Sequence, residues 1–159
     1  MRVRKRHFGV VGVAVCLEVL TGGTAIPADS TRPREGVVFR HIVDDAPLDV
    51  SLRPNEAATE AVEHFHATGK NLYVGKSEAI TEGKAHYEAW CQSCHLPDGS
   101  GRIGPSLTDD VYGYARTKTD VGQFEIILAG GTGAMQPFRD RLTQDEILKV
   151  IAYVHSLRR

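Results

Sequence analysis

The sequence lacks a surplus of basic charge and lacks an apolar segment long enough to cross a membrane. Its 159 residues carry 19 Lys and Arg against 20 Asp and Glu, and four of the basic residues fall within the first seven positions. The apolar run at residues 8–20 contains Glu18 and is too short for a membrane-spanning helix. Small residues follow it. This pattern is typical of a secretory signal peptide cleaved near Ala25 or Ala28, and retention of the segment as an anchor is the alternative.

Cleavage after Ala28 would leave a mature chain with a net negative charge. Four basic residues and Glu18 would be lost, so 15 of 19 basic and 19 of 20 acidic side chains would remain, for a net charge of −4. Without a basic surplus to neutralise phosphates, we expect no nucleic-acid partner. An acidic surface suits a partner that bears a basic patch. With 42% hydrophobic and 25% charged residues, the chain has the composition of one ordinary domain, not of a disordered, collagen-like or membrane-bundle protein.

Cysteine is also scarce. Of three cysteines, Cys16 falls in the segment expected to be removed, and the mature chain keeps Cys91 and Cys94, with His95 directly after them. Cys-x-x-Cys-His is typical of c-type haem attachment, because two thiols at this spacing reach both vinyl groups of one porphyrin while the adjacent imidazole lies beneath the iron. A thioredoxin-like dithiol, which expects a preceding strand, and a structural zinc site, which needs four ligands, are the alternatives. We expect one covalently bound haem c, attached outside the cytoplasm.

Methionine is the scarcest of the candidate iron ligands. Apart from the initiator, the chain has only Met135, in a glycine-rich loop at residues 130–137. Such a loop can approach a porphyrin face, so we predict that Met135 binds the iron opposite His95; a core-filling methionine is the alternative. A His–Met pair raises the reduction potential and fills both axial positions, which favours electron transfer over oxygen activation. The rival distal ligands are His41, His64, His66, His86 and His155.

The loop after the haem motif supplies further candidates for contact with a haem. We predict that the Pro105 carbonyl accepts a hydrogen bond from His95 Nδ1 and thereby orients the ring; a plain turn is the alternative. Tyr112, Tyr114 and Arg116 follow, and we predict that they contact the haem propionates. An exposed polar loop is the alternative for these three residues.

Apolar spacing and capping residues predict an all-α domain. The expected helices cover residues 56–68, run from Ser77 or Ala79 into the haem motif, cover residues 121–129, and extend from Thr143 toward the C-terminus. The expected caps are Asn55, Asp120 with Gln123, and Thr143 with Glu146. Gly83 would let another helix cross the second helix closely. Residues 96–119 are rich in Gly and Pro and predict an irregular loop wrapped around a ligand.

These features together resemble the class I cytochromes c. The resemblance rests on Gly83, Tyr87, the Cys-x-x-Cys-His motif, residues 104–107, the methionine loop and Tyr153. More narrowly, the chain is similar to the cytochrome c-L family, over residues 99–110, 119–125, 130–131 and 142–146 and, in the N-terminal part, from Phe39 to about residue 73. Residues 111–116 depart from the family pattern.

The resemblance implies a class I cytochrome c fold with helices around one covalently bound haem and an N-terminal extension. It divides the chain into a signal peptide (1–28), an arm and helix (29–70) and a haem domain (71–159). It further implies a periplasmic electron-transfer protein, not an enzyme and without a stable membrane anchor. Its expected donor is a dehydrogenase that uses pyrroloquinoline quinone (PQQ) to oxidise methanol, and its acceptor a downstream cytochrome c or oxidase. An ethanol-type PQQ dehydrogenase as donor is one alternative, and a haem sensor or enzyme with an open iron site is another.

Overall fold

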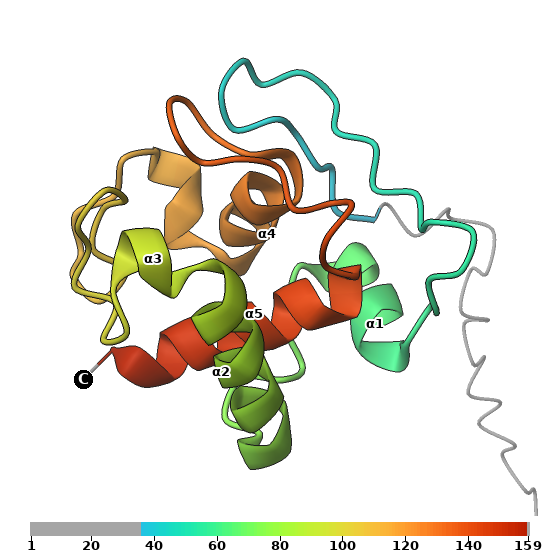
Figure 1. The fold of residues 1–159 in the computed structure, drawn as a ribbon. Coiled ribbons are helices and arrows are strands. Elements are labelled where there is room, and N and C mark those ends of the chain that lie inside the picture. Colours follow the sequence, from blue (N-terminus) through green and yellow to red (C-terminus); the bar gives the residue numbers. More distant parts are fainter. Residues whose placement is uncertain (1–35, 159) are drawn as a thin grey trace, which may run out of the picture. The chain divides into compact units, whose positions relative to one another are not determined.

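Helices are the regular elements of the part of the chain that the structure describes. The computed structural model describes residues 36–158, and the predicted signal segment lies outside them. The elements are α1 (Glu60–Thr68), α2 (Ser77–Trp90), α3 (Gln92–His95), the short 3₁₀ helix η1 (Ala115–Lys118), α4 (Asp120–Ala129) and α5 (Gln144–Leu157) (Figure 1). The expected all-α fold is confirmed over this range. In the arm, an isolated antiparallel bridge joins Arg40 to Pro47.

Helix α5 is the central element of the core, and it packs against α1, α2 and α4. Figure 1 shows α2 crossing α5 near the middle of the molecule. A Cβ atom at Gly83 of α2 would collide with the Lys149 carbonyl group of α5, so the two backbones touch at the crossing. The close crossing expected from Gly83 is confirmed. The buried apolar side chains of α5 include Ile147, Leu148, Val150, Ile151 and Val154.

The arm and α1 share a buried aromatic cluster with α4. Phe39 of the arm, Phe65 of α1 and Phe124 of α4 are all buried, with ring centroids between 5.1 and 5.9 Å apart. The Val37 amide also donates to the His66 carbonyl oxygen at 2.8 Å. The described part of the arm is therefore packed on the helices through both apolar and backbone contacts.

Two helices begin at other residues than the sequence predicts. Helix α1 starts at Glu60 with Thr59 as its cap, and not at Glu56 after Asn55. The Glu56 carboxylate accepts from the Gln144 amide at the start of α5. Helix α4 is capped by the Thr119 hydroxyl and not by Asp120. The capping box of Thr143 and Glu146 is confirmed.

Candidate functional site

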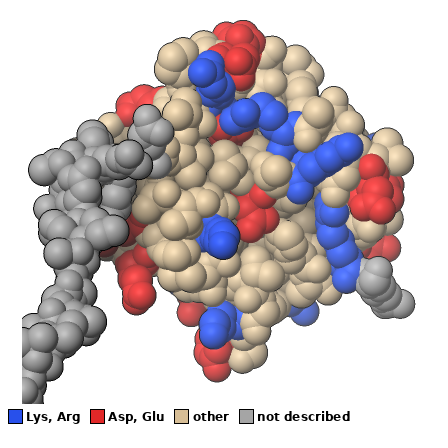
Figure 2. All heavy atoms as spheres, turned by 180° about the vertical axis from the view of Figure 1, so that it is seen from behind, with Lys and Arg blue, Asp and Glu red and all other residues tan. Residues whose placement is uncertain are grey.

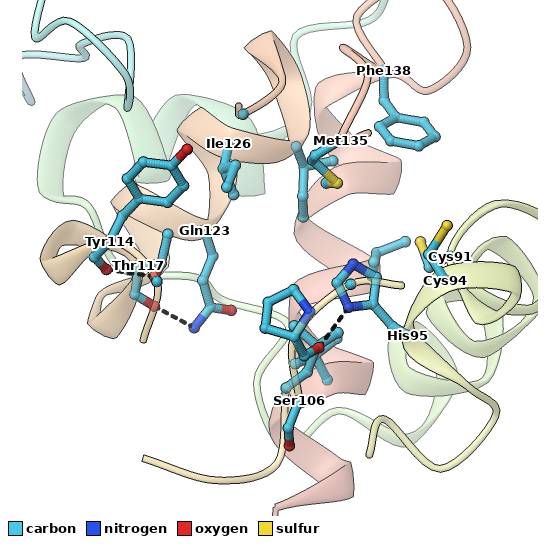
Figure 3. A pocket seen from close by; sticks show the side chains of 18 of the residues that line it. Cys91, Cys94, His95, Ser106, Tyr114, Thr117, Gln123, Ile126, Met135 and Phe138 are labelled. Carbon is cyan, nitrogen blue, oxygen red and sulfur yellow. Dashed lines mark hydrogen bonds between the residues drawn. The ribbon is translucent and has the colours of Figure 1, made fainter. Parts of the chain in front are cut away.

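The Cys-x-x-Cys-His segment forms one tight helical turn at the end of α2. The amides of Cys94 and His95 both donate to the Cys91 carbonyl oxygen, at 3.1 and 2.9 Å. This turn places the two sulfur atoms beside the His95 ring, as Figure 3 shows. Burial, and to a lesser degree the neighbouring Cys94, raises the pKa of the Cys91 thiol to about 12. A thioredoxin-like dithiol expects a preceding strand, whereas within the described residues helix α2 leads into the motif, so the fold argues against that alternative.

The proximal histidine candidate is held by the loop that follows it. His95 Nδ1 lies 2.9 Å from the Pro105 carbonyl oxygen, the contact expected from the sequence. Because a carbonyl only accepts, Nδ1 carries the proton and Nε2 keeps the free lone pair that a metal requires. A Cβ atom at Gly104 would lie 2.7 Å from Nδ1, so only glycine lets the loop pass this close to the ring.

Met135 lies in a closed loop between α4 and α5. The Gly131 amide donates to the Met135 carbonyl oxygen at 3.0 Å, and the Phe138 amide donates to the Ile127 carbonyl oxygen of α4 at 2.9 Å. The Met135 side chain is half-buried and points toward the cavity that His95 also faces (Figure 3). Residues far apart in the chain thus meet at one cavity.

The cavity has a volume of about 770 Å³, within the range of small-molecule and cofactor sites. Tyr114, Gln123 and Ile126 lie across it from the two cysteines (Figure 3). Its apolar lining includes Leu107, Ile126, Ile127, Val150, Ile151 and Val154. Two thiols, an imidazole and a thioether around an apolar cavity are the groups that attach and ligate a haem c, so the residues present fit that cofactor.

The three residues predicted to contact the haem propionates do not all lie at the cavity. Tyr112 and Tyr114 line the cavity, whereas Arg116 is outside its lining. The Arg116 guanidinium donates two hydrogen bonds to the fully buried Glu125 carboxylate, with Nε 2.9 Å from Oε2, and these bonds raise the pKa of Arg116. The guanidinium therefore pairs with Glu125 of α4, and Arg116 does not lie where the predicted propionate contact would require it.

Arg158 is a cavity residue that sequence reasoning missed. It lines the cavity, stacks 5.2 Å from the Tyr112 ring centroid, and donates to the Leu107 carbonyl oxygen at 3.0 Å and to the Tyr112 hydroxyl. In the sequence it reads as a cation that complements the dipole at a helix C-terminus. The sequence feature that could have identified Arg158 is a cation at the end of the helix that lines the cavity. We propose that Arg158, with Tyr112, contacts a haem propionate.

None of the rival histidines lines the cavity within residues 36–158. His66 hydrogen-bonds to Gln144 at 2.7 Å, and His155 hydrogen-bonds to Asp120 at the same distance. In the same range, no three His, Cys, Asp or Glu side chains gather closely enough to hold a metal ion by themselves. The arrangement therefore favours Met135 among the candidate distal ligands, and gives no support to a zinc site.

Comparisons with known proteins find a family model for the haem part of the chain and relatives over most of its length. The family model described as "Cytochrome C oxidase, cbb3-type, subunit III" matches residues 78–154. Cytochrome c-L of Methylorubrum extorquens is 36% identical over 151 residues, which cover 92% of this chain and 76% of that protein.

Two solved structures are similar over most of the chain. Cytochrome cL from the marine methylotrophic bacterium Methylophaga aminisulfidivorans superposes with a TM-score of 0.75 at 42% identity, covering 77% of this chain and 81% of the other. Cytochrome cL from Hyphomicrobium denitrificans superposes with a TM-score of 0.74 at 34% identity, covering 78% and 75%.

Proposed function

Because the chain belongs to the cytochrome c-L family, we propose that it takes single electrons from a PQQ-dependent methanol dehydrogenase in the periplasm and passes them to a downstream cytochrome c or oxidase. It has the class I cytochrome c fold and one covalently bound haem c, and it is an electron-transfer protein of methylotrophy and not an enzyme.

The observation that carries the proposal is that Cys91, Cys94, His95 and Met135 face one apolar cavity. In this proposal the two cysteines would form the thioether bonds, and His95 Nε2 and Met135 Sδ would ligate the iron. A haem bound in this way supplies one-electron iron chemistry. With protein side chains as both ligands, small molecules would be kept off the iron, which suits a carrier and not a sensor.

The rim of the cavity supports transfer through an exposed edge. Trp90, Ile103 and Val111 line the cavity and are also exposed, at 43%, 65% and 76%. Redox partners meet through small, transient interfaces, and an apolar rim around the cofactor lets a partner approach closely without a large buried area. We infer that the dehydrogenase docks over this rim.

The start of the sequence supports the compartment. Its basic and apolar pattern predicts export, and haem attachment to a Cys-x-x-Cys-His motif occurs outside the cytoplasm. No helix within residues 36–158 has the length and apolar character to span a membrane. The division into residues 1–28, 29–70 and 71–159 remains our proposal.

A single-turnover measurement tests the donor. Purified methanol dehydrogenase, with its quinone reduced, is mixed with the oxidised cytochrome, and haem reduction is followed in a stopped-flow instrument; an ethanol-type PQQ dehydrogenase is the parallel sample. We expect fast reduction by the methanol enzyme and slow reduction by the other. The reverse order would assign the protein to ethanol oxidation. If neither enzyme reduces a cytochrome that dithionite reduces fully, the donor proposal is wrong.

A second measurement separates a carrier from a sensor or enzyme. The proposal expects the ferrous wild-type protein to bind carbon monoxide slowly, because Met135 holds the distal position. Rapid binding to the wild type would contradict the carrier function and favour an open iron site.

A further inference from the structure

The loop that carries Met135 has a firm base and a lightly held tip. At the base, the Gly131 amide bonds to the Met135 carbonyl oxygen, and Phe138 is bonded to α4 through the Ile127 carbonyl oxygen. The tip, residues 132–134, is exposed. It contains Gly133 at φ 76°, in the left-handed region that favours glycine, and a Cβ atom there would meet no other heavy atom within 4 Å.

One side chain fastens this tip to the rest of the described chain. The Tyr114 hydroxyl oxygen accepts from the Thr132 amide at 2.9 Å and lies 2.5 Å from Thr132 Oγ1. The contact with the Thr132 side chain, and then the bond from its backbone amide, lower the pKa of Tyr114. Within residues 36–158 these are the hydrogen bonds of the tip.

Tyr114 itself stands on a rigid support. Its carbonyl oxygen accepts from the Thr117 amide at 3.1 Å and from the Thr117 hydroxyl at 2.7 Å, which closes the first turn of η1. Helix η1 is in turn joined to α4 by Arg116 and the fully buried Glu125. The Glu125 carboxylate also accepts from the Arg40 amide of the arm at 2.8 Å. The hydroxyl is therefore presented from a fixed position.

We propose that Tyr114 is a positioning residue for the distal iron ligand: its bond to Thr132 holds the methionine loop closed over the cavity and keeps the Met135 sulfur at the iron. Only two residues, Gly133 and Ala134, separate Thr132 from Met135, so the tip is short enough for its movement to reach the segment that carries the sulfur. The inference rests on Met135 as the distal ligand and does not depend on the identity of the electron donor. It gives Tyr114 another role than the propionate contact expected from the sequence.

The test replaces single hydroxyl groups in the holoprotein. Tyr114→Phe removes the acceptor and keeps the ring. Thr132→Val removes the side-chain hydroxyl and keeps the amide bond, so its effect should be smaller. Tyr153→Phe is the matched control, because the Tyr153 ring packs against Tyr87 and its hydroxyl has no hydrogen bond within the described residues.

Three readouts follow the loop and the iron separately. In Tyr114→Phe we expect faster hydrogen exchange at the Thr132 amide. The sulfur-to-iron charge-transfer band should be lost at a lower temperature than that of global unfolding. Carbon monoxide should bind to the ferrous protein about 2- to 10-fold faster, the factor that one or two weak hydrogen bonds supply. The double variant should be no worse than Tyr114→Phe alone. The control should match the wild type in all three.

Two results would overturn the inference. If the Thr132 amide exchanges at the wild-type rate in Tyr114→Phe, the hydroxyl does not hold the loop. If exchange rises while the band and carbon monoxide binding stay unchanged, the tip is held but does not control ligation. Should Tyr114→Phe fold poorly, the charge-transfer band and the carbon monoxide binding rate of Thr132→Val decide, and wild-type values for both would show that the side-chain contact with Tyr114 does not control ligation. Absence of the band from the wild type would remove the premise about Met135 and leave the donor proposal standing.

Discussion

Two glycines decide where the candidate iron ligands can lie. At Gly104 a Cβ atom would enter the His95 ring, and at Gly130, with φ 82°, it would come within 2.9 Å of the Met135 carbonyl oxygen. Any side chain at either position would displace the segment that carries a ligand. The positions of the imidazole and the thioether therefore depend on the absence of a side chain at these two glycines as well as on their own contacts.

Replacement of Met135 by alanine tests the distal ligand at this scale. We expect the variant to lose the sulfur-to-iron charge-transfer band, to have a lower reduction potential because the soft thioether no longer favours ferrous iron, and to bind carbon monoxide rapidly. Near-infrared absorption and potentiometric titration measure the first two. An unchanged near-infrared spectrum would assign the distal position to another residue.

Among the helices, α5 depends on a polar network at its first turn. Asp145 accepts hydrogen bonds from the Thr59 hydroxyl, which also caps α1, at 2.7 Å, and from the Tyr73 hydroxyl at 2.6 Å. Lys149 Nζ lies 3.0 Å away on the next turn. The start of α5, the start of α1 and the connection between α1 and α2 are therefore joined through one carboxylate.

This network predicts a specific loss of stability in acid. Burial by itself would raise the pKa of Asp145, but hydrogen bonds from Tyr73, Thr59 and Lys149 outweigh it and hold the pKa below its usual value of 3.8. Because the folded pKa is the lower one, the carboxylate's contribution is fully present above the unfolded pKa and is lost as pH falls through the folded pKa.

Asp145→Asn should therefore have a free energy of unfolding that depends less steeply on pH below about pH 4. Urea denaturation at a series of pH values measures the slope, and Asp140→Asn, at an exposed position, is the control. A variant that keeps the full wild-type slope in acid would show that Asp145 is not the group that titrates.

At the scale of the whole molecule, charge governs how partners meet. The face in Figure 2 carries Lys and Arg side chains interspersed with Asp and Glu, with no field of one sign across it. The mature chain has a net charge of −4 if cleavage follows Ala28. Near the loops around the cavity, exposed carboxylates come from Asp98, Asp109 and Asp110, whereas Asp120 is joined to His155.

These carboxylates predict the salt dependence of electron transfer from the dehydrogenase. We expect the second-order reduction rate to fall as ionic strength rises, because steering is screened over a Debye length of about 8 Å at physiological salt. Replacing Asp98, Asp109 and Asp110 together by Asn removes three charges and keeps the side-chain oxygens that accept from the Ser100 and Val111 amides. The triple variant should react more slowly and show a smaller salt slope. A wild-type rate and slope would place docking elsewhere.

The sequence by itself determined the local features of this protein. The spacing of two thiols and an imidazole marks haem attachment, because that chemistry is confined to five consecutive residues. The period of the apolar residues located the helices, and the capping box of Thr143 and Glu146 located the start of α5, because each of these signals operates within one or two helical turns. The scarcity of methionine singled out Met135.

Only the tertiary structure decided which polar groups become partners. Glu56, expected to begin α1, lies outside that helix, and its carboxylate accepts from the Gln144 amide of α5, 88 residues away. Arg116 turns to the buried Glu125, while Arg158 reaches the cavity from the end of α5. A charged side chain takes whichever partner the packed helices bring within hydrogen-bond distance, and packing brings together residues whose separation along the chain carries no periodic signal. For that reason the haem motif could be identified from the sequence, whereas the side chains that line and support the cavity could be identified only from the fold.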